Sequence, residues 1–337
     1  VNVSPYISTY SEGMSGSCSP KDLETMMQLV YLYFTAPRAD EEAFTSEMQR
    51  TKAMLKNMEL NPMITLSDSL NKVMYNNHPL VKRMTVEDYD KVDYAKAMEM
   101  YKDRFADPNN FTFIFVGNID VETFKPLVEQ YLASLNKNKR KDNWKNVGIE
   151  ITEEDYVTHY QKEMRDAKTS VYMIYNGDMK YNLKNQVYMS VLSDVLDIVY
   201  TKTIREEQGG TYGVGVMGTI NNRPNDNFRF LIAFDTNDEV YATLMDIAKA
   251  GLRDMAENGP RQEDLSKVLE NKLKKRTEQL QENAFWTNAI ISNEADDIDI
   301  LTEYEEIING ITIESLADFT KQILKGNLKE VVQLPAK

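Results

Sequence analysis

The sequence predicts an α+β fold built from two similar domains, each with a mixed, mainly antiparallel sheet and helices packed on one face. Strand and helix patterns alternate, with several adjacent strands and paired helices, which favours separate layers of sheet and helix. The order of elements near the start of the chain returns near its end. The chain has 337 residues, 42% hydrophobic and 27% charged, which suits a globular protein of two or three domains.

The first copy of the pattern is expected over residues 1–135. Ser19 followed by Pro20 is a typical helix start, and apolar residues recur at helical spacing from Leu23 to Phe34. Aromatic and β-branched residues dominate Phe111 to Val116, which predicts a strand. The elements predicted here are a strand at 1–9, a helix at 19–35, a more charged helix after the break at 37–40, a helix from 85 to about 105, and a strand at 111–116.

The second copy is expected over residues 155–337. Its helix break at Pro260 lies 223 positions after the break at Pro37, and the helix start at Ile313 lies 227 positions after Val86. This near-constant offset favours a repeated domain over a chance likeness of amphipathic helices. The elements predicted here are strands near 156–164 and 170–175, a helix near 183–203, a strand from 211, helices after 238, 261 and 312, and a strand at 330–334.

The two copies differ in completeness. No residues before Val1 match the two strands and the helix predicted in 156–210. A sheet without these strands exposes unpaired backbone groups at an edge. We therefore expect the first domain to be truncated at its start, and the chain to be a fragment or to have its sheet completed by a partner.

A polar, basic stretch within residues 136–154 is expected to be a linker between the domains. Its alternative is a nucleic-acid patch, but no aromatic residues that could stack with bases are interleaved with its lysines. A net charge of −14 also disfavours non-specific binding to nucleic acid or to anionic membranes. No apolar run reaches the roughly 18 residues of a membrane span. We expect a soluble protein, and bacterial periplasm and cytoplasm both fit.

Several common kinds of site are disfavoured. The single cysteine, Cys18, excludes an internal disulfide, and His78 and His159 lie too far apart for a local zinc motif. The spelling G-x-G-x-x-G occurs at 213–218, but a turn rather than a helix follows it, so we do not expect a dinucleotide. The carboxylates at 294–299 are expected to form a solvated acidic loop rather than a cation site.

The stretch from Ile204 to Val214 is the most informative, because a helix end, two glycines and a strand start follow one another there. Its Arg205 and Tyr212, seven positions apart, resemble the Arg-Glu…Gly…Tyr signature of the pitrilysin/insulinase-type zinc peptidases. The helix-break-helix at 33–44 and the strand and turn at 113–120 resemble the same family. The likeness extends over nearly the whole chain.

This resemblance implies one half of a clamshell enzyme. In the family, the N-terminal half holds zinc with an H-x-x-E-H motif, and the C-terminal half closes over the peptide. This chain contains no H-x-x-E-H, so it resembles the C-terminal, non-zinc-binding half and is predicted to be inactive alone. We expect no cofactor in this chain, zinc in the N-terminal half, and that half and a peptide substrate as partners.

The resemblance also implies residue roles. Tyr212 would donate a hydrogen bond to the oxyanion of the tetrahedral intermediate, Arg205 would bind substrate carbonyls, and Gly209, Gly210 and Gly213 would let a peptide backbone approach. Residue type alone permits simpler interpretations, in which Arg205 pairs with a carboxylate and Tyr212 is a half-buried strand residue. Two other functions also stay open, a catalytically inactive structural or assembly subunit and an independent metalloenzyme with a dispersed site.

Overall fold

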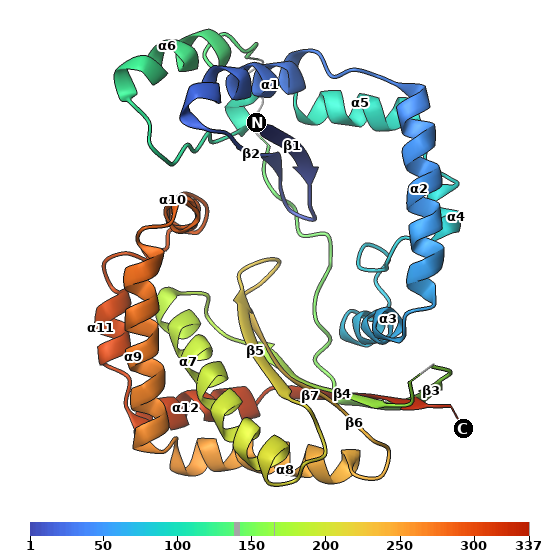
Figure 1. Ribbon diagram of the computed structural model, residues 1–337, viewed down its shortest axis with the longest axis vertical. Helices are drawn as coiled ribbons and strands as arrows, with labels where there is room; N and C mark the ends of the chain where they lie inside the picture. Colours follow the sequence, from blue (N-terminus) through green and yellow to red (C-terminus); the bar gives the residue numbers. More distant parts are fainter. Residues whose placement is uncertain (138–141, 165, 337) are drawn as a thin grey trace. The chain divides into compact units, whose positions relative to one another are not determined.

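The computed structural model describes residues 1–137, 142–164 and 166–336. They form helices and two sheets, which confirms the predicted α+β class (Figure 1). The chain divides into two compact units. The first comprises Val1–Leu60 and Met84–Asn146, and the second comprises Asn61–Arg83 and Val147–Lys337. Residues 61–83, expected in the first repeat domain, therefore belong to the second unit.

The first unit contains one hairpin and several helices. Strands β1 (Asn2–Ile7) and β2 (Glu12–Ser17) pair antiparallel. Its core forms where Met27 meets Leu132 and Leu135, because these apolar side chains share one buried cluster. The helices are α1 (Leu23–Thr35), α2 (Glu41–Glu59), α4 (Val86–Tyr89), α5 (Tyr94–Arg104) and α6 (Val121–Tyr131).

Two predictions for the first unit are wrong. The single helix expected from 85 to 105 is two helices, because the side chain of Asp93 accepts a hydrogen bond from the Lys96 backbone and starts α5 anew. The segment expected as a strand at 111–116 pairs with no strand among the described residues. Its Phe111 ring instead packs against Phe34 of α1, with 5.0 Å between ring centres.

The second unit is built on a five-stranded sheet in the order β3-β7-β4-β6-β5. β3 and β7 are parallel, and the other neighbours are antiparallel. β7 is the last strand along the chain, yet it lies inside the sheet between β3 and β4. The strands are β3 (Tyr156–Lys162), β4 (Thr169–Asp178), β5 (Val214–Asn221), β6 (Asn227–Thr236) and β7 (Asn327–Pro335).

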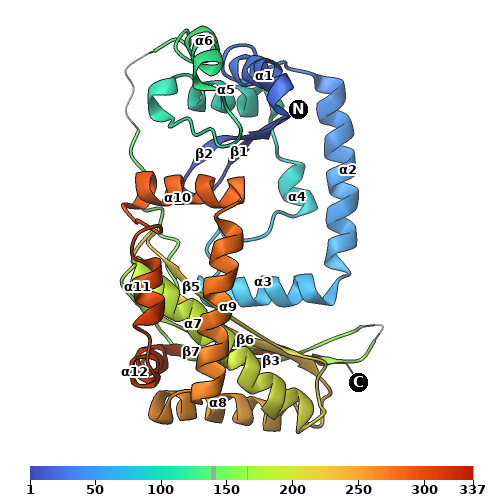
Figure 2. The same ribbon diagram turned by 60° about the vertical axis from the view of Figure 1, so that its left-hand side comes forward.

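A layer of helices covers one face of this sheet. Buried side chains such as Leu192 and Leu252 pack there against Met173 and Ile232 of the strands. α9 extends away from this layer, and α10 lies across its far end (Figure 2). The helices are α7 (Leu183–Tyr200), α8 (Tyr241–Asn258), α9 (Gln262–Gln279), α10 (Asn283–Asp296), α11 (Tyr304–Asn309) and α12 (Ile313–Leu324).

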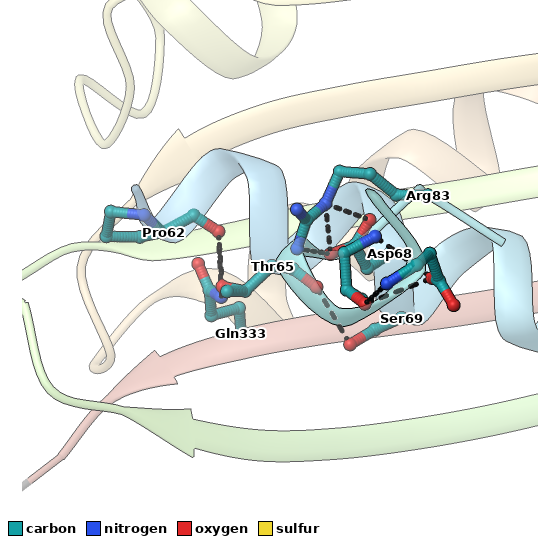
Figure 3. A network of polar contacts seen from close by, with 8 residues as sticks. Pro62, Thr65, Asp68, Ser69, Arg83 and Gln333 are labelled. Carbon is teal, nitrogen blue, oxygen red and sulfur yellow. Dashed lines mark hydrogen bonds and ion pairs between the residues drawn. The ribbon is translucent and has the colours of Figure 1, made fainter. Parts of the chain in front are cut away.

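The opposite face of the sheet is covered by α3 (Pro62–Met74). Its Leu66, Leu70 and Met74 recur at helical spacing and pack against Ile174 and Val331. A polar network holds the first turn of the helix to the sheet (Figure 3). In this network, the Gln333 side chain of β7 donates to the Pro62 carbonyl at 3.2 Å. Helix α3 comes from between two segments of the first unit, but it completes the core of the second.

The end of the predicted linker also packs on this face. The Thr152 backbone donates to the Met74 carbonyl at 2.9 Å, and Lys329 of β7 donates to the Thr152 carbonyl at 2.7 Å. The basic residues 138–141 of that linker lie outside the described residues. Residues 151–155 are therefore bound to the sheet rather than free.

The order of elements repeats along the chain. Hairpin β1-β2 and helices α1 to α5 are followed by the unpaired segment 111–116, while hairpin β5-β6 and helices α8 to α12 are followed by β7. Thr85 and Thr312 both start a helix with a capping box, but α4 has four residues and α12 has twelve. None of the helices in the described residues is long and apolar enough to cross a membrane.

Candidate functional site

Arg205 lies where α7 ends. The helix continues through Thr201–Glu206 as a π-helix, a wider form that is rare and often occurs at functional sites. Ile204 is fully buried and anchors this turn in the core, whereas its neighbour Arg205 is exposed. The chain therefore presents the guanidinium from a rigidly held backbone.

The two glycines after the helix shape the turn. Gly209 has φ of +64°, which glycine adopts readily, and its N–H donates to the Arg205 carbonyl at 3.1 Å. At Gly210, an added Cβ would lie 3.0 Å from Val240 and 3.2 Å from Leu244. The turn thus needs Gly209 for its conformation and Gly210 for its packing against α8. The space beside Gly210 is filled, whereas nothing lies within 4 Å of an added Cβ at Gly209.

Tyr212 follows this turn, two residues before β5 begins at Val214. Its side chain is 99% exposed. Thr211 stabilises the turn, since its hydroxyl donates to the Gly213 carbonyl at 2.9 Å and accepts from the Gly213 N–H at 3.2 Å. Sequence reasoning missed Thr211 as a positioning residue, although a threonine beside Tyr-Gly is a typical turn signal. Around Gly213, nothing lies within 4 Å of an added Cβ, so the backbone there is open.

The simpler interpretations of these two residues do not describe the structure. Within the described part of the chain, the Arg205 side chain makes no ion pair, although Glu206 and Glu207 follow it directly. Tyr212 is not half-buried. Both side chains are thus exposed on one short segment and are not needed to hold the fold together.

The glycine-rich spelling at 213–218 forms the strand β5 and no phosphate site, because β5 leads into β6 through a turn and not into a helix. Gly218 has a packing role. An added Cβ there would overlap the Met189 sulfur of α7, and the Gly218 N–H donates to the Ser193 hydroxyl at 3.0 Å. α7 therefore crosses close over the second half of β5.

The metal-ligating side chains in the described part of the chain are not gathered into a zinc site. Among the residues described, no group of three or more His, Cys, Asp or Glu is placed to hold a metal ion. His159 of β3 packs edge-on against the Tyr241 ring, and His78 accepts a hydrogen bond from the Leu80 backbone at 3.3 Å. Both histidines thus have structural neighbours.

The acidic residues near 294–299 correct one prediction. Glu294 and Asp296 belong to the end of α10 rather than to a loop. The Asp296 carboxylate is only 14% exposed and pairs with Arg223 at 3.2 Å, where it also accepts from Asn222 at 2.6 Å. It ties the β5-β6 turn to α10 and is not a solvated charge.

A family model described as the peptidase M16 inactive domain matches residues 91–272. The chain belongs to this family. A zinc protease described as PQQL-like from Arabidopsis thaliana is 27% identical over 287 residues, which cover 80% of this chain and 30% of the relative. The chain thus spans about a third of that relative's length. The predicted resemblance to the non-zinc-binding half of a pitrilysin/insulinase-type zinc peptidase is confirmed.

Solved structures of proteases share the fold of this chain. The periplasmic protease PqqL from Escherichia coli matches with a TM-score of 0.85 at 20% identity, over 99% of this chain and 37% of that chain. The separately solved first half of that protease matches with a TM-score of 0.73 at 17% identity, over 98% of this chain and 75% of that chain. This fold therefore resembles part of the whole protease and its separately solved first half.

Proposed function

We propose that this chain is the substrate-binding, non-catalytic C-terminal half of a zinc-dependent endopeptidase acting on peptides. One observation supports this most strongly. Arg205 and Tyr212 flank one turn, are exposed, and have no hydrogen-bond or ion-pair partner among the described side chains. A guanidinium and a phenol held this way, in a member of the M16 inactive domain family, are suited to an incoming ligand.

The two side chains offer different chemistry. Arg205 has a permanent charge and several N–H donors in a fixed plane, so it holds peptide carbonyls in one orientation. Tyr212 offers a neutral hydroxyl, which donates a hydrogen bond to the oxyanion as the scissile carbonyl becomes tetrahedral. Only the second interaction strengthens in the transition state, so the two residues affect different kinetic constants.

A companion half is part of this proposal, because the described residues contain no group of three or more metal ligands and the curated relative is about three times longer. Zinc held by that half would supply the activated water. The companion is an N-terminal half, either in the same polypeptide or as a separate subunit.

The test is Tyr212→Phe in the complete protein with its companion half. We expect kcat to fall about 100-fold to 1,000-fold with little change in KM, because one oxyanion donor is lost. The matched control is Tyr156→Phe, which removes the hydroxyl of an exposed tyrosine on β3. Equal peptide cleavage by the two variants would remove Tyr212 from the mechanism.

A second variant, Arg205→Lys, keeps the charge and removes the planar fork of donors. We expect KM to rise about tenfold or more, since a hydrogen bond to a charged group contributes roughly 1.5–3 kcal/mol. Steady-state kinetics at several peptide concentrations measure this. An unchanged KM would show that Arg205 does not hold the substrate.

The alternative function is a catalytically inactive structural or assembly subunit of the same fold. It is favoured by the lack of a metal-ligating group among the described residues. Native mass spectrometry of the complete protein distinguishes the two functions. A stable large assembly without zinc and without peptidase activity would support the structural subunit.

A further inference from the structure

The free edge of the five-stranded sheet lies directly beside Tyr212. β5 pairs with β6 on one side only, so its other side is an edge in the described sheet (Figure 1). Tyr212 lies two residues before the first residue of this strand, Val214, and Arg205 lies nine residues before it. An edge strand presents a row of unpaired N–H and C=O groups, to which another extended chain can bind.

The direction of the β5 backbone groups follows from Gly218. Its N–H points away from β6, because it donates to the Ser193 hydroxyl of α7. Alternate residues of a strand point the same way, so the N–H and C=O groups of Val214 and Val216 also face outward. Gly215 and Met217 then pair with Ala233 and Leu231 of β6.

The two halves of this edge are not equivalent. In the second half, α7 lies so close that Gly218 has no space for a Cβ and its outward N–H is already bonded. In the first half, no hydrogen bond from Val214 or Val216 to a residue outside the sheet is found within the described ranges. The outward groups without a hydrogen-bond partner in the described ranges therefore lie in the part next to Tyr212, where Val216 is half-buried and Val214 is 6% exposed.

This edge also lacks the usual protection against strand pairing. Natural edges carry charged side chains, prolines or bulges. From Gln208 through Asn222 the sequence has no charged residue and no proline, although 27% of the chain is charged. Met217 is 55% exposed and Tyr212 is almost fully exposed on the same stretch.

The opposite edge of the sheet provides a contrast. β3 contains Lys162 and is flanked by Asp155 and Glu163. In β3, the Lys162 carbonyl accepts from the Ala336 N–H beside β7, so alternation places the Val157 N–H on the outward side. Both edges have outward N–H groups, but only β5 combines an uncharged edge with an exposed arginine and tyrosine.

We propose that the outward N–H and C=O groups of Val214 and Val216 bind an extended peptide substrate as an added strand, in register with Arg205 and Tyr212. This inference rests on the proposed function and names the backbone part of that site. Recognition of this kind reads the main chain first, so it tolerates many peptide sequences. Gly213 and Gly215 leave the β5 surface bare where large peptide side chains would lie.

The test uses Val216→Pro, which removes one outward N–H and leaves the ladder to β6 intact. Val157→Pro is the matched control, because it makes the same change at an outward position of β3. The probe is a fluorescein-labelled decapeptide of alternating Thr and Val with one Lys and one Glu. A second probe carries N-methyl groups on five successive residues, so that neither of its edges can donate. Circular dichroism and urea unfolding verify that each variant is folded.

In fluorescence anisotropy, we expect Val216→Pro to weaken binding of the decapeptide at least fivefold. Val157→Pro should change this affinity less than twofold. The N-methylated probe should bind the wild-type chain at least tenfold more weakly than the decapeptide does. Hydrogen exchange at 213–217 should slow when the decapeptide is added. Equal affinities of the two variants, equal binding of both probes, or no binding by the wild-type chain up to millimolar concentration would overturn the proposal. A dimer that Val216→Pro converts to monomer, with unchanged peptide binding, would also overturn it and assign the edge to a second copy.

The outcome separates this inference from the proposed function. If Tyr212→Phe abolishes cleavage by the complete protein and Val216→Pro does not affect it, the strand-addition proposal fails and the role of Tyr212 stands. If Val216→Pro abolishes peptide binding and the complete protein with Tyr212→Phe cleaves peptides normally, the β5 edge binds peptide. The proposed role of Tyr212 at the oxyanion then fails.

Discussion

Lys329 is a charged residue of β7 whose side chain has no exposed surface. Its ammonium group has three N–H donors, and it donates to the carbonyls of Thr152 and Glu154 at 2.7 and 2.9 Å and to the Asn176 side chain at 3.0 Å. Burial lowers the pKa of Lys329 because the charged form loses contact with water. The residue therefore fastens residues 152–154 to the sheet at some electrostatic cost.

We expect Lys329→Met to lower the free energy of unfolding by roughly 1–3 kcal/mol, because the buried acceptors lose their donor. Urea unfolding measures this. Lys325→Met is the control, since that lysine is exposed and should change stability by less than about 0.5 kcal/mol. Equal stability of the two variants would show that other contacts hold residues 152–154.

Tyr175 of β4 gives a prediction at high pH. Burial raises the pKa of this phenol to about 12, whereas a tyrosine in the unfolded chain has a pKa of about 10. Between these values the unfolded state loses its proton first, so the stability present below pH 10 declines as the pH rises toward 12. Urea unfolding at pH 8 and pH 11 measures this. The free energy of unfolding of Tyr175→Phe should fall by about 1.4 kcal/mol less than that of the wild type between these two pH values. An equal loss would contradict the raised pKa.

At the scale of the element, β5 offers a matched pair of glycines. Gly218→Ala places a Cβ against Met189, which should lower the free energy of unfolding by roughly 1–3 kcal/mol. Gly215→Ala is on the other face, where only the Ala233 carbonyl is near, at 3.8 Å, and should leave stability unchanged or slightly higher. Thermal unfolding compares them. Equal effects would show that α7 does not pack on Gly218 as described.

Local signals predicted many elements correctly, because their causes lie within a few residues. A helix was expected after 312, and Thr312 caps α12 there. The strand pattern near 170–175 marks the buried β4. The break within 85–105 was missed, because Asp93 is one of many acidic residues in the chain. The segment 111–116 has strand composition but no paired neighbour, and pairing is not visible in local sequence. Nor does any residue pattern mark the π-helix that carries Arg205.

The candidate site was predicted by resemblance more than by chemistry. Arg205 and Tyr212 were identified from their spacing, and the structure adds that both are exposed and that Thr211 orders the turn between them. The open half of the β5 edge could not be predicted, since it depends on where α7 crosses Gly218. Contacts over such sequence separations are tertiary and leave no periodic signal.

For the whole molecule, α3 decides how the chain can be divided. Residues 147–337 alone would expose Ile174 and Val331, which α3 covers. We expect this piece to bind the dye ANS and to unfold at lower urea concentration than a piece in which residues 61–83 are joined to it. Equal stability of the two pieces would show that α3 is dispensable. The sequence-based boundary at 135 missed this, because an amphipathic helix does not reveal which sheet it covers.

The position of β7 has a consequence for synthesis of the protein. Ribosomes make β3, β4, β5 and β6 before β7, and among the strands that the structure describes β3 is hydrogen-bonded only to β7. Until residues 327–335 emerge, β3 has nowhere to dock and β4 has one open side. The sheet can therefore close only after residues 327–335 have been translated. A premature stop codon shortly before Asn327 should consequently be as harmful as one far upstream.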